Sequence, residues 1–246
     1  MLSIPKSTGD NTDYAHGIRH FISSQNFVAD PAQVDYDVQT YITRRSSMLN
    51  SLGVEADKNA YLAFHRMSTR ISPRLEGYHH TLNMQFKWND AFDGNPTCSR
   101  VHNSFYFDWA NCLWNLAAHE SLQGSKTNRS TEDGIRNSCK LFQSAAGIFD
   151  FISSNLMKPM TATNLNLSVM DVEEGLEQSY TSNISMATLE FCKVLMLAQA
   201  QLCFYEKAVR DSKGGKMKAA TVAKLALQVA KYYETAMQVS SRLEDS

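Results

Sequence analysis

The sequence predicts a mainly α-helical fold that contains a small N-terminal β-sheet. Most of the chain repeats apolar residues at alternating steps of three and four, the spacing that places them on one face of a helix. One short segment instead alternates apolar and polar residues, as a half-buried strand does. Hydrophobic residues make up 43% and charged residues 20% of the 246 residues. This length and composition are sufficient for the core of a folded domain.

Two helices are expected in the first third of the chain. The first follows Asp30 and keeps its apolar residues on one face, and Gly53 is expected to end it. The second carries Tyr61 and Phe64 on one face. Pro73 is expected to weaken this helix after its last apolar residue, because proline cannot donate the backbone hydrogen bond.

The strand is predicted from the alternation of Met84, Phe86 and Trp88 with polar residues. A single strand leaves its backbone groups unpaired, so it needs a partner. Leu2 and Ile4, near the start of the chain, are the expected source of that partner strand.

The rest of the chain is expected to be helical. Residues 105–122 are apolar almost all round, which predicts a central, buried helix, and Gly124 suits its C-terminal end. Ser130 is the expected N-cap of the next helix. Three apolar stripes then follow: Ile135, Cys139, Phe142, Ala146, Phe149, Ile152 and Leu156; Ile184, Ala187, Phe191, Val194, Ala198, Leu202 and Tyr205; and Val222, Leu225, Val229, Tyr232, Ala236, Val239 and Leu243. Such stripes favour antiparallel neighbours packed against one another.

Composition argues against a nucleic-acid-binding protein and favours a cytosolic one. Lys and Arg number 24 against 25 Asp and Glu, whereas a general nucleic-acid binder normally has a basic excess. No apolar run approaches the roughly 20 residues of a membrane span, and the N-terminus lacks the pattern of a secretory signal. The five cysteines are widely spaced and odd in number, which favours reduced thiols in the cytosol.

Catalytic and metal-binding motifs are not evident. His119-Glu120 begins like a zinc-protease motif, but Gln123 stands where the second histidine belongs. His16 and His20 are four residues apart without an evident third ligand, so we interpret them as surface histidines. No serine has a G-x-S-x-G setting. We therefore expect no catalytic residue, no cofactor and no metal.

Several segments, in order along the chain, resemble the Bro-one domain family of the Alix-like type. Phe86-Lys-Trp-Asn-Asp-Ala-Phe-Asp93 is similar to that family's F-x-W-x-D-A-F-D strand. Further similar segments are Cys112-Leu-Trp-Asn-Leu-Ala-Ala-His119, Lys140-Leu-Phe-Gln-Ser-Ala-Ala-Gly-Ile-Phe149, Met196-Leu-Ala-Gln-Ala-Gln201, Lys207-Ala-Val-Arg-Asp211 and Val222-Ala-Lys-Leu-Ala226. The start, Ile4-Pro-Lys-Ser-Thr8, also resembles the Alix-type start.

The resemblance implies a curved helical bundle or solenoid, partly repeat-like, and a function in binding rather than catalysis. Its implied partner is the C-terminal amphipathic helix of a charged multivesicular body subunit of ESCRT-III. The implied role is an adaptor in endosomal sorting and multivesicular body formation. The protein would then be cytoplasmic and held peripherally at endosomal membranes through its partners.

Carried over by alignment, the resemblance implies one protein-binding surface. Its members are Glu132, Arg136, Phe204, Lys207, Thr221, Lys224 and Leu225. In helix-in-groove recognition, apolar anchors supply affinity and charges at the rim set the register. Leu225 lies in the third apolar stripe and Phe204 adjoins the second, so their spacing alone favours core positions.

The chain departs from the family pattern at this surface. Thr221 stands where the family typically has isoleucine, and losing that apolar anchor corresponds to ~1–2 kcal/mol of binding free energy. Ser212-Lys-Gly-Gly215 resembles an insertion before the last helix. A second reading therefore stays open, a signalling scaffold of the Rhophilin or phosphatase-linked type with a different protein partner.

The resemblance covers roughly the first two thirds of a Bro-one domain. We interpret the chain as a partial domain with a strand and helix part at residues 1–95 and a helical core at 96–246. The helices that follow in longer relatives would cover the last helices here. Leu197, Leu227 and Met237 lie off the main stripes. We therefore expect marginal stability or self-association through the C-terminal helices.

Overall fold

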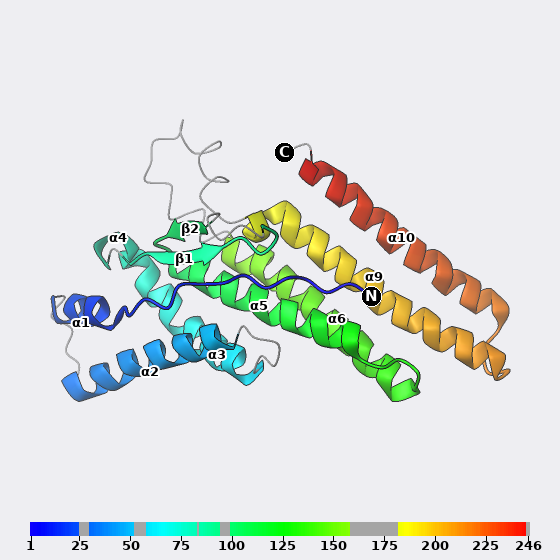
Figure 1. Ribbon diagram of the computed structural model, residues 1–246, viewed down its shortest axis with the longest axis horizontal. Helices are drawn as coiled ribbons and strands as arrows, with labels where there is room; N and C mark the ends of the chain where they lie inside the picture. The colour runs from blue at the N-terminus through cyan, green and yellow to red at the C-terminus, as the bar shows by residue number, and fades with distance from the viewer. Residues whose placement is uncertain (25–29, 52–57, 83, 94–98, 158–181, 245–246) are drawn as a thin grey trace. The chain divides into compact units, whose positions relative to one another are not determined.

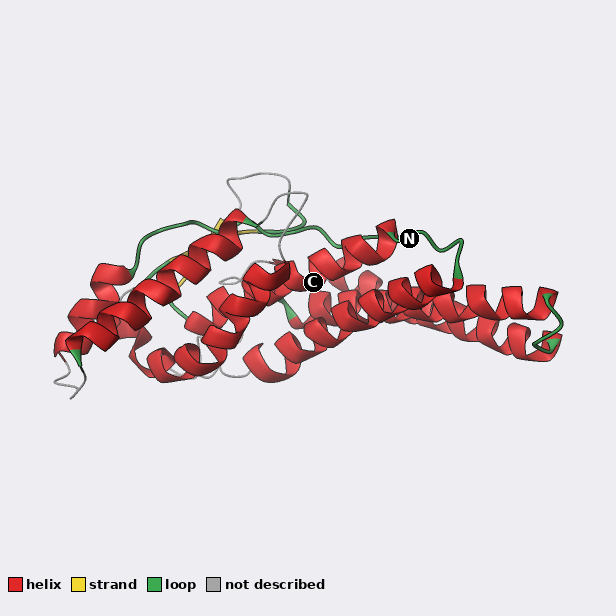
Figure 2. Cartoon of the chain, turned by 90° about the horizontal axis from the view of Figure 1, so that it is seen from below, coloured by secondary structure: helices red, strands yellow, loops and turns green. Residues whose placement is uncertain are grey.

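The computed structural model describes residues 1–24, 30–51, 58–82, 84–93, 99–157 and 182–244. Gly53, the expected end of a helix, and Cys98, one of the five cysteines, lie outside these ranges. The described residues are mainly helical (Figures 1 and 2). The helices are α1 (Ala15–Ser24), α2 (Pro31–Asn50), α3 (Lys58–Leu75), η1 (Glu76–Tyr78), α4 (His79–Leu82), α5 (Phe105–Lys126), α6 (Glu132–Phe151), η2 (Ile152–Leu156), η4 (Ser182–Ile184), α9 (Met186–Lys213) and α10 (Ala219–Glu244). The strands are β1 (Phe86–Asn89) and β2 (Ser99–His102). The predicted fold class, helical with a small sheet, is confirmed.

The chain forms two compact units. One contains residues 1–5, 116–154 and 185–246, and the other contains residues 6–115 and 155–184. Helix α5 is therefore divided between the units: residues 105–115 belong to the unit with residues 6–115, and residues 116–126 belong to the unit with residues 1–5. The sequence-based division at residues 95 and 96 follows the order of strands and helices along the chain, and it stays a prediction.

The unit built on α1, α2, α3 and the sheet has an aromatic core. Tyr61, Phe64, Phe86, Trp88 and Phe105 are all 1% exposed or less. The Phe86 ring meets the Phe105 ring edge to face, with centroids 5.2 Å apart, a favoured geometry for aromatic pairs. The alternation that predicted the strand therefore reflects burial of one face of β1.

The partner of β1 differs from the expected one. β1 pairs antiparallel with β2, with Phe86 opposite His102 and Asn89 opposite Ser99. The N-terminal segment meets β1 further along, where Gly9 and Trp88 form an isolated antiparallel bridge and Asn89 hydrogen-bonds to Ser7 and Thr8. Leu2 and Ile4 lie in the other unit, where the amide of Leu2 donates to Gln199 and that of Ile4 donates to Ser121. The prediction that they form a strand beside β1 was wrong.

Side-chain amides hold the extended N-terminal segment in both units. Asn115 accepts from the Ser7 amide at 2.8 Å and donates to the Ser7 carbonyl at 2.8 Å. Gln199 makes the same pair of hydrogen bonds with Leu2: it accepts from the Leu2 amide at 2.5 Å and donates to the Leu2 carbonyl at 3.1 Å. Each amide side chain thus satisfies a donor and an acceptor as a neighbouring strand would. This explains why Asn115 and Gln199 occupy buried positions within two of the family-like segments.

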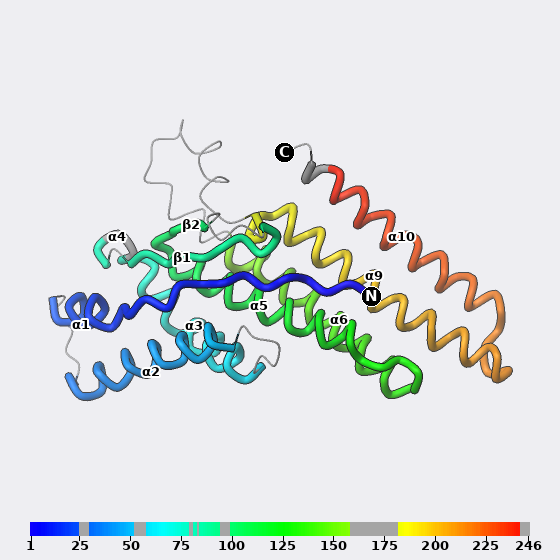
Figure 3. Tube along the Cα trace, in the orientation of Figure 1, coloured from blue at the N-terminus to red at the C-terminus, as the bar shows by residue number. Residues whose placement is uncertain are grey.

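The other unit is built from the second half of α5 together with α6, α9 and α10. Helix α9 packs against α6 and against α10, and the trace in Figure 3 shows α9 and α10 running antiparallel. The α6 stripe continues through η2, one π-helical turn, and all seven of its residues are buried. The α10 stripe is only half-buried apart from Ala236, and the side chain of Leu243 lies outside the description.

Three details of the helices correct the expectations. Pro73 lies inside α3 rather than beyond it. Thr131, rather than Ser130, is the N-cap of α6, and its side chain accepts from the Gly134 amide. Gly124 lies within α5, and a Cβ there would be 3.1 Å from the Phe142 ring. Its role is close packing against α6, not termination of α5.

Helix α9 is long and apolar enough to cross a bilayer by length and composition, with a mean hydropathy of 1.2 over its best window. The sequence analysis expected no apolar run of membrane-spanning length, and α9 exceeds that expectation. However, 56% of that window is buried inside the fold. Burial between α6 and α10 accounts for the apolar character, as in the central helix of a bundle.

Candidate protein-binding surface

The seven residues that the resemblance assigns to partner binding lie on α6, α9 and α10, in one compact unit. We call them the α6–α9–α10 surface. Glu132 and Arg136 occupy the first turns of α6, Phe204 and Lys207 the second half of α9, and Thr221, Lys224 and Leu225 the first turns of α10. Phe204 is nine residues before the last residue of α9, and Leu225 six after the first of α10. Because the helices are antiparallel, the two residues lie at similar heights along them.

A chain of ion pairs joins α6 to α9. Glu132 Oε1 lies 3.3 Å from Arg136 Nη2 and 3.4 Å from Lys207 Nζ. Lys207 also lies 2.8 Å from Asp211 Oδ2, one turn further along α9. The hydrogen bond to Asp211 raises the pKa of the Lys207 ammonium. Side chains in this network are 24–60% exposed, so solvent screens the pairs and each contributes little stability. Their arrangement instead leaves both signs of charge exposed at the surface.

The apolar members have different exposures. Phe204 is 47% exposed. It is therefore not a core residue, although its spacing along α9 favoured a core position. Leu225 is half-buried on α10, the helix that packs against α9. It therefore contributes to packing and still presents part of its side chain to solvent.

Thr221 and Lys224 are exposed on the first turns of α10. The expected insertion, Ser212 to Gly215, lies at the end of α9. Ser212 and Lys213 are the last two residues of this helix, and Gly214 is its C-cap. Gly215 has φ of 74°, a left-handed conformation that side chains with a Cβ rarely adopt. The glycine therefore permits the tight reversal of the chain between α9 and α10.

Among the described residues, no three His, Cys, Asp or Glu side chains gather as metal ligands would. The ring centroids of His16 and His20 are 6.5 Å apart on one face of α1. The four described cysteines, Cys112, Cys139, Cys192 and Cys203, are buried free thiols. Burial raises the pKa of the Cys139 thiol to about 11 and that of Cys112 well above its ordinary value. Raised values favour the protonated, unreactive form of a thiol.

The sequence did not reveal a buried polar network in the other unit. Arg45 makes an ion pair with Asp108, and the Trp88 indole donates to the same carboxylate. Trp88 belongs to the family-like strand, but within this network Arg45 is 43 residues and Asp108 is 20 residues away from it in the sequence. No local pattern connects them.

A helical domain that presents exposed apolar residues among charges of both signs is typical of protein-binding modules. The model of the BRO1-like domain matches residues 1–246, so the chain belongs to the BRO1-like domain family. The chain is 27% identical over 240 residues to "ALG-2 interacting protein X" of Dictyostelium discoideum, covering 97% of this chain and 27% of the relative. It is 25% identical over 239 residues to "Vacuolar protein-sorting protein bro1" of Aspergillus fumigatus, covering 97% of this chain and 22% of the relative.

Solved structures agree with this assignment. The structure described as "ALIX BRO1 CHMP4C complex" superposes with a TM-score of 0.74 at 25% identity, over 98% of this chain and 64% of that chain. The chain thus spans about a quarter of the length of the two relatives and under two thirds of the solved domain. The helical fold and the family resemblance read from the sequence are confirmed.

Proposed function

We propose that this chain is a non-enzymatic adaptor that binds the C-terminal amphipathic helix of an ESCRT-III charged multivesicular body subunit. The observation that carries the proposal is the 47% exposure of Phe204, one helical turn from Lys207, which pairs with Glu132 in the charged cluster of Glu132, Arg136 and Lys207. Phe204 precedes Lys207 by three residues, so the two are neighbours on the surface of α9. An apolar anchor with charges at its rim suits the apolar face of a helix and its flanking charges.

The complex of the ALIX domain with CHMP4C supports this kind of partner. The names of the relatives support a role in protein sorting, and we place the chain in the cytoplasm, peripherally at endosomes. No binding to nucleic acid is proposed. All seven residues of the α6–α9–α10 surface belong to the proposal, with Phe204 and Leu225 as the apolar anchors.

Calorimetric titration of the chain with a synthetic C-terminal ESCRT-III helix tests the proposal. Phe204→Asp and Leu225→Asp should each weaken binding at least tenfold, about 1.4 kcal/mol. The matched control is Met186→Asp, because Met186 is 54% exposed on α9 but outside the proposed surface. That variant should bind within about twofold of the original chain. Circular dichroism and thermal melting should show that the variants remain folded.

Equal loss of affinity in all three variants would contradict a specific surface. Unfolding of Phe204→Asp would mean that the ring belongs to the core. A signalling scaffold of the Rhophilin or phosphatase-linked type is the second candidate, and it is favoured by Thr221, which replaces an apolar anchor with a hydroxyl. Absence of binding by both the original chain and Thr221→Ile would favour this second candidate.

A further inference from the structure

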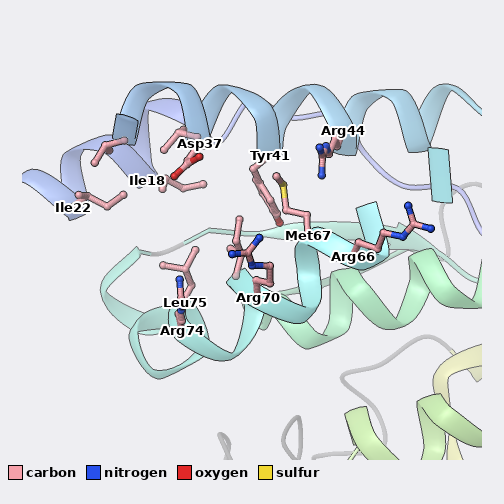
Figure 4. A pocket seen from close by; sticks show the side chains of 13 residues that line it. Ile18, Ile22, Asp37, Tyr41, Arg44, Arg66, Met67, Arg70, Arg74 and Leu75 are labelled. Atoms are coloured by element: carbon pink, nitrogen blue, oxygen red, sulfur yellow. The ribbon is translucent and has the colours of Figure 1, made fainter. Parts of the chain in front are cut away.

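A groove separate from the α6–α9–α10 surface lies between α1, α2 and α3. It encloses a volume of about 470 Å³, within the range of roughly 300–1,000 Å³ that is common for ligand sites. Its lining comes only from these three helices of one compact unit. Figure 4 shows Tyr41 of α2 and Met67 of α3 extending toward one another across it.

The floor and walls of the groove are apolar. Ile18, Val38 and Tyr41 are buried at its floor. Its walls include half-buried Met67, Ile71 and Leu75, which repeat every four residues along α3, with Ile22 and Val34 on the facing helices. Half-buried aliphatic side chains retain apolar area that a ligand can remove from water.

The rim of the groove is strongly basic. Arg66, Arg70 and Arg74 repeat every four residues on α3, and Arg44 faces them from α2. All four are exposed, and within the described part of the chain their guanidinium groups make no ion pair. By contrast, Arg19 on neighbouring α1 lies 2.6 Å from Asp35. The one acidic lining residue, Asp37, already accepts a hydrogen bond from Gln33 at 3.0 Å.

We propose that this groove is a docking site for an acidic amphipathic helix of a partner protein. Arg66 and Arg74 are eight residues apart, about 12 Å along α3, the length of a little over two helical turns. A partner helix with apolar residues at steps of three and four can place them in the groove. Its flanking Asp and Glu side chains then meet the arginines, whose planar guanidinium groups pair with carboxylates in a two-point geometry.

The concave shape favours a helix over a membrane surface. The side chains of Ile18, Val38 and Tyr41 that line the groove are buried, whereas the four arginines that line it are exposed. A flat layer of anionic headgroups can contact the rim but leaves the apolar floor unfilled. Side chains that project from a helix reach the floor and the rim together. Charge complementarity selects an acidic partner, because four arginines face a single aspartate.

The test uses two labelled peptides in fluorescence anisotropy titrations with the full chain. One is a 14-residue helix-forming peptide with leucines on one face and glutamates elsewhere, and the second has lysine in place of every glutamate. The double variant Arg70→Glu with Arg74→Glu should weaken binding of the acidic peptide at least tenfold. The matched control is Arg100→Glu, which reverses an exposed charge on β2 outside the groove and should change affinity less than twofold.

The lysine peptide should bind at least tenfold more weakly than the glutamate peptide. A leucine-scrambled glutamate peptide should also bind weakly, because it lacks an apolar face. The proposal is overturned if both charge types bind alike, if the scrambled peptide binds equally well, or if Arg100→Glu weakens binding as much as the groove variant. It is also overturned if the acidic peptide does not bind while phosphatidylserine vesicles bind in an Arg70- and Arg74-dependent way, since the groove would then be a lipid site.

A further titration separates this groove from the proposed ESCRT-III surface. The groove variant should bind the ESCRT-III helix with unchanged affinity, and Phe204→Asp should bind the acidic peptide with unchanged affinity. If the ESCRT-III helix loses affinity through Arg70 and Arg74, the two sites are one and the proposal of a separate site fails.

Discussion

Arg45 and Asp108 form a buried two-point ion pair between α2 and α5. Arg45 Nε donates to Asp108 Oδ2 at 3.0 Å and Nη2 donates to Oδ1 at 2.9 Å, and the side chains are 2% and 1% exposed. Trp88 Nε1 donates to the same Oδ1 at 2.8 Å, and Arg45 Nη1 donates to the Asp10 carbonyl at 2.8 Å. The Asp108 carboxylate of α5 thus binds side chains from α2 and β1. The Arg45 guanidinium also binds the backbone of the N-terminal segment at Asp10.

Removing the charge of Asp108 should be strongly destabilising. Asp108→Asn leaves the Arg45 guanidinium buried without a counter-charge, and we expect it to lower the free energy of unfolding by about 3–5 kcal/mol. Urea denaturation measures this change. Asp35→Asn is the matched control, because the Arg19–Asp35 pair is 38% and 63% exposed and should cost at most about 1 kcal/mol. Similar losses in both variants would contradict a special role for the buried pair.

Gly124→Ala should destabilise the protein, whereas Gly147→Ala should not. The new Cβ at position 124 would be 3.1 Å from the Phe142 ring, which is fully buried, while nothing lies within 4 Å of a Cβ at position 147. We expect a loss of about 1–3 kcal/mol for the first and a gain of about 0.5–1 kcal/mol for the second, from higher helix propensity. Thermal melts of both variants test the difference, and a gain in both would show that Phe142 moves aside without cost.

Thr221→Ile should tighten binding of the ESCRT-III helix by about tenfold, or ~1.4 kcal/mol. The substitution adds apolar area and removes a hydroxyl that loses its water on binding. Thr235→Ile on the same helix is the control, because Thr235 is exposed and lies outside the proposed surface. Calorimetry that finds equal affinity for Thr221→Ile and the original chain would show that position 221 does not face the partner.

The four described cysteines should resist alkylation in the folded protein at pH 8. Their thiol pKa values are raised by burial, to about 11 for Cys139. A raised thiol pKa stabilises the fold fully below the unfolded value near 9, and this contribution is lost as the pH rises from 9 toward 11. Mass spectrometry after brief iodoacetamide treatment should find these four unmodified until urea is added. Rapid labelling of Cys139 in the folded state would contradict its burial.

The chain should self-associate through α10. Leu227 is 58% and Met237 is 72% exposed on this helix, and exposed apolar side chains along one helix tend to bind a partner or a second copy. Sedimentation velocity over a concentration series should show a growing oligomer, and Leu227→Lys with Met237→Lys should keep the chain monomeric. A strictly monomeric chain with a high, concentration-independent melting temperature would contradict this expectation.

Local patterns were sufficient to locate most of the elements. The stripe from Ile135 to Leu156 and the alternation around Phe86 reveal helix and strand because burial follows the period of the backbone. Likewise, the ordered family-like segments were sufficient to identify the family. The surface residues came from that resemblance rather than from periodicity, which placed Phe204 in the core although its ring is 47% exposed.

The sequence alone therefore determined helices α2, α3, α5, α6, α9 and α10, the strand β1 and the family. Only the tertiary structure decided the partner of β1, the reason for a glycine at position 124, the pairing of Arg45 with Asp108 and the groove lined by α1, α2 and α3. Periodicity records which face of an element is buried, but it does not record what covers that face. Contacts such as that of Arg45 with Asp108 join residues far apart in the chain, so they are set by packing rather than by any local pattern.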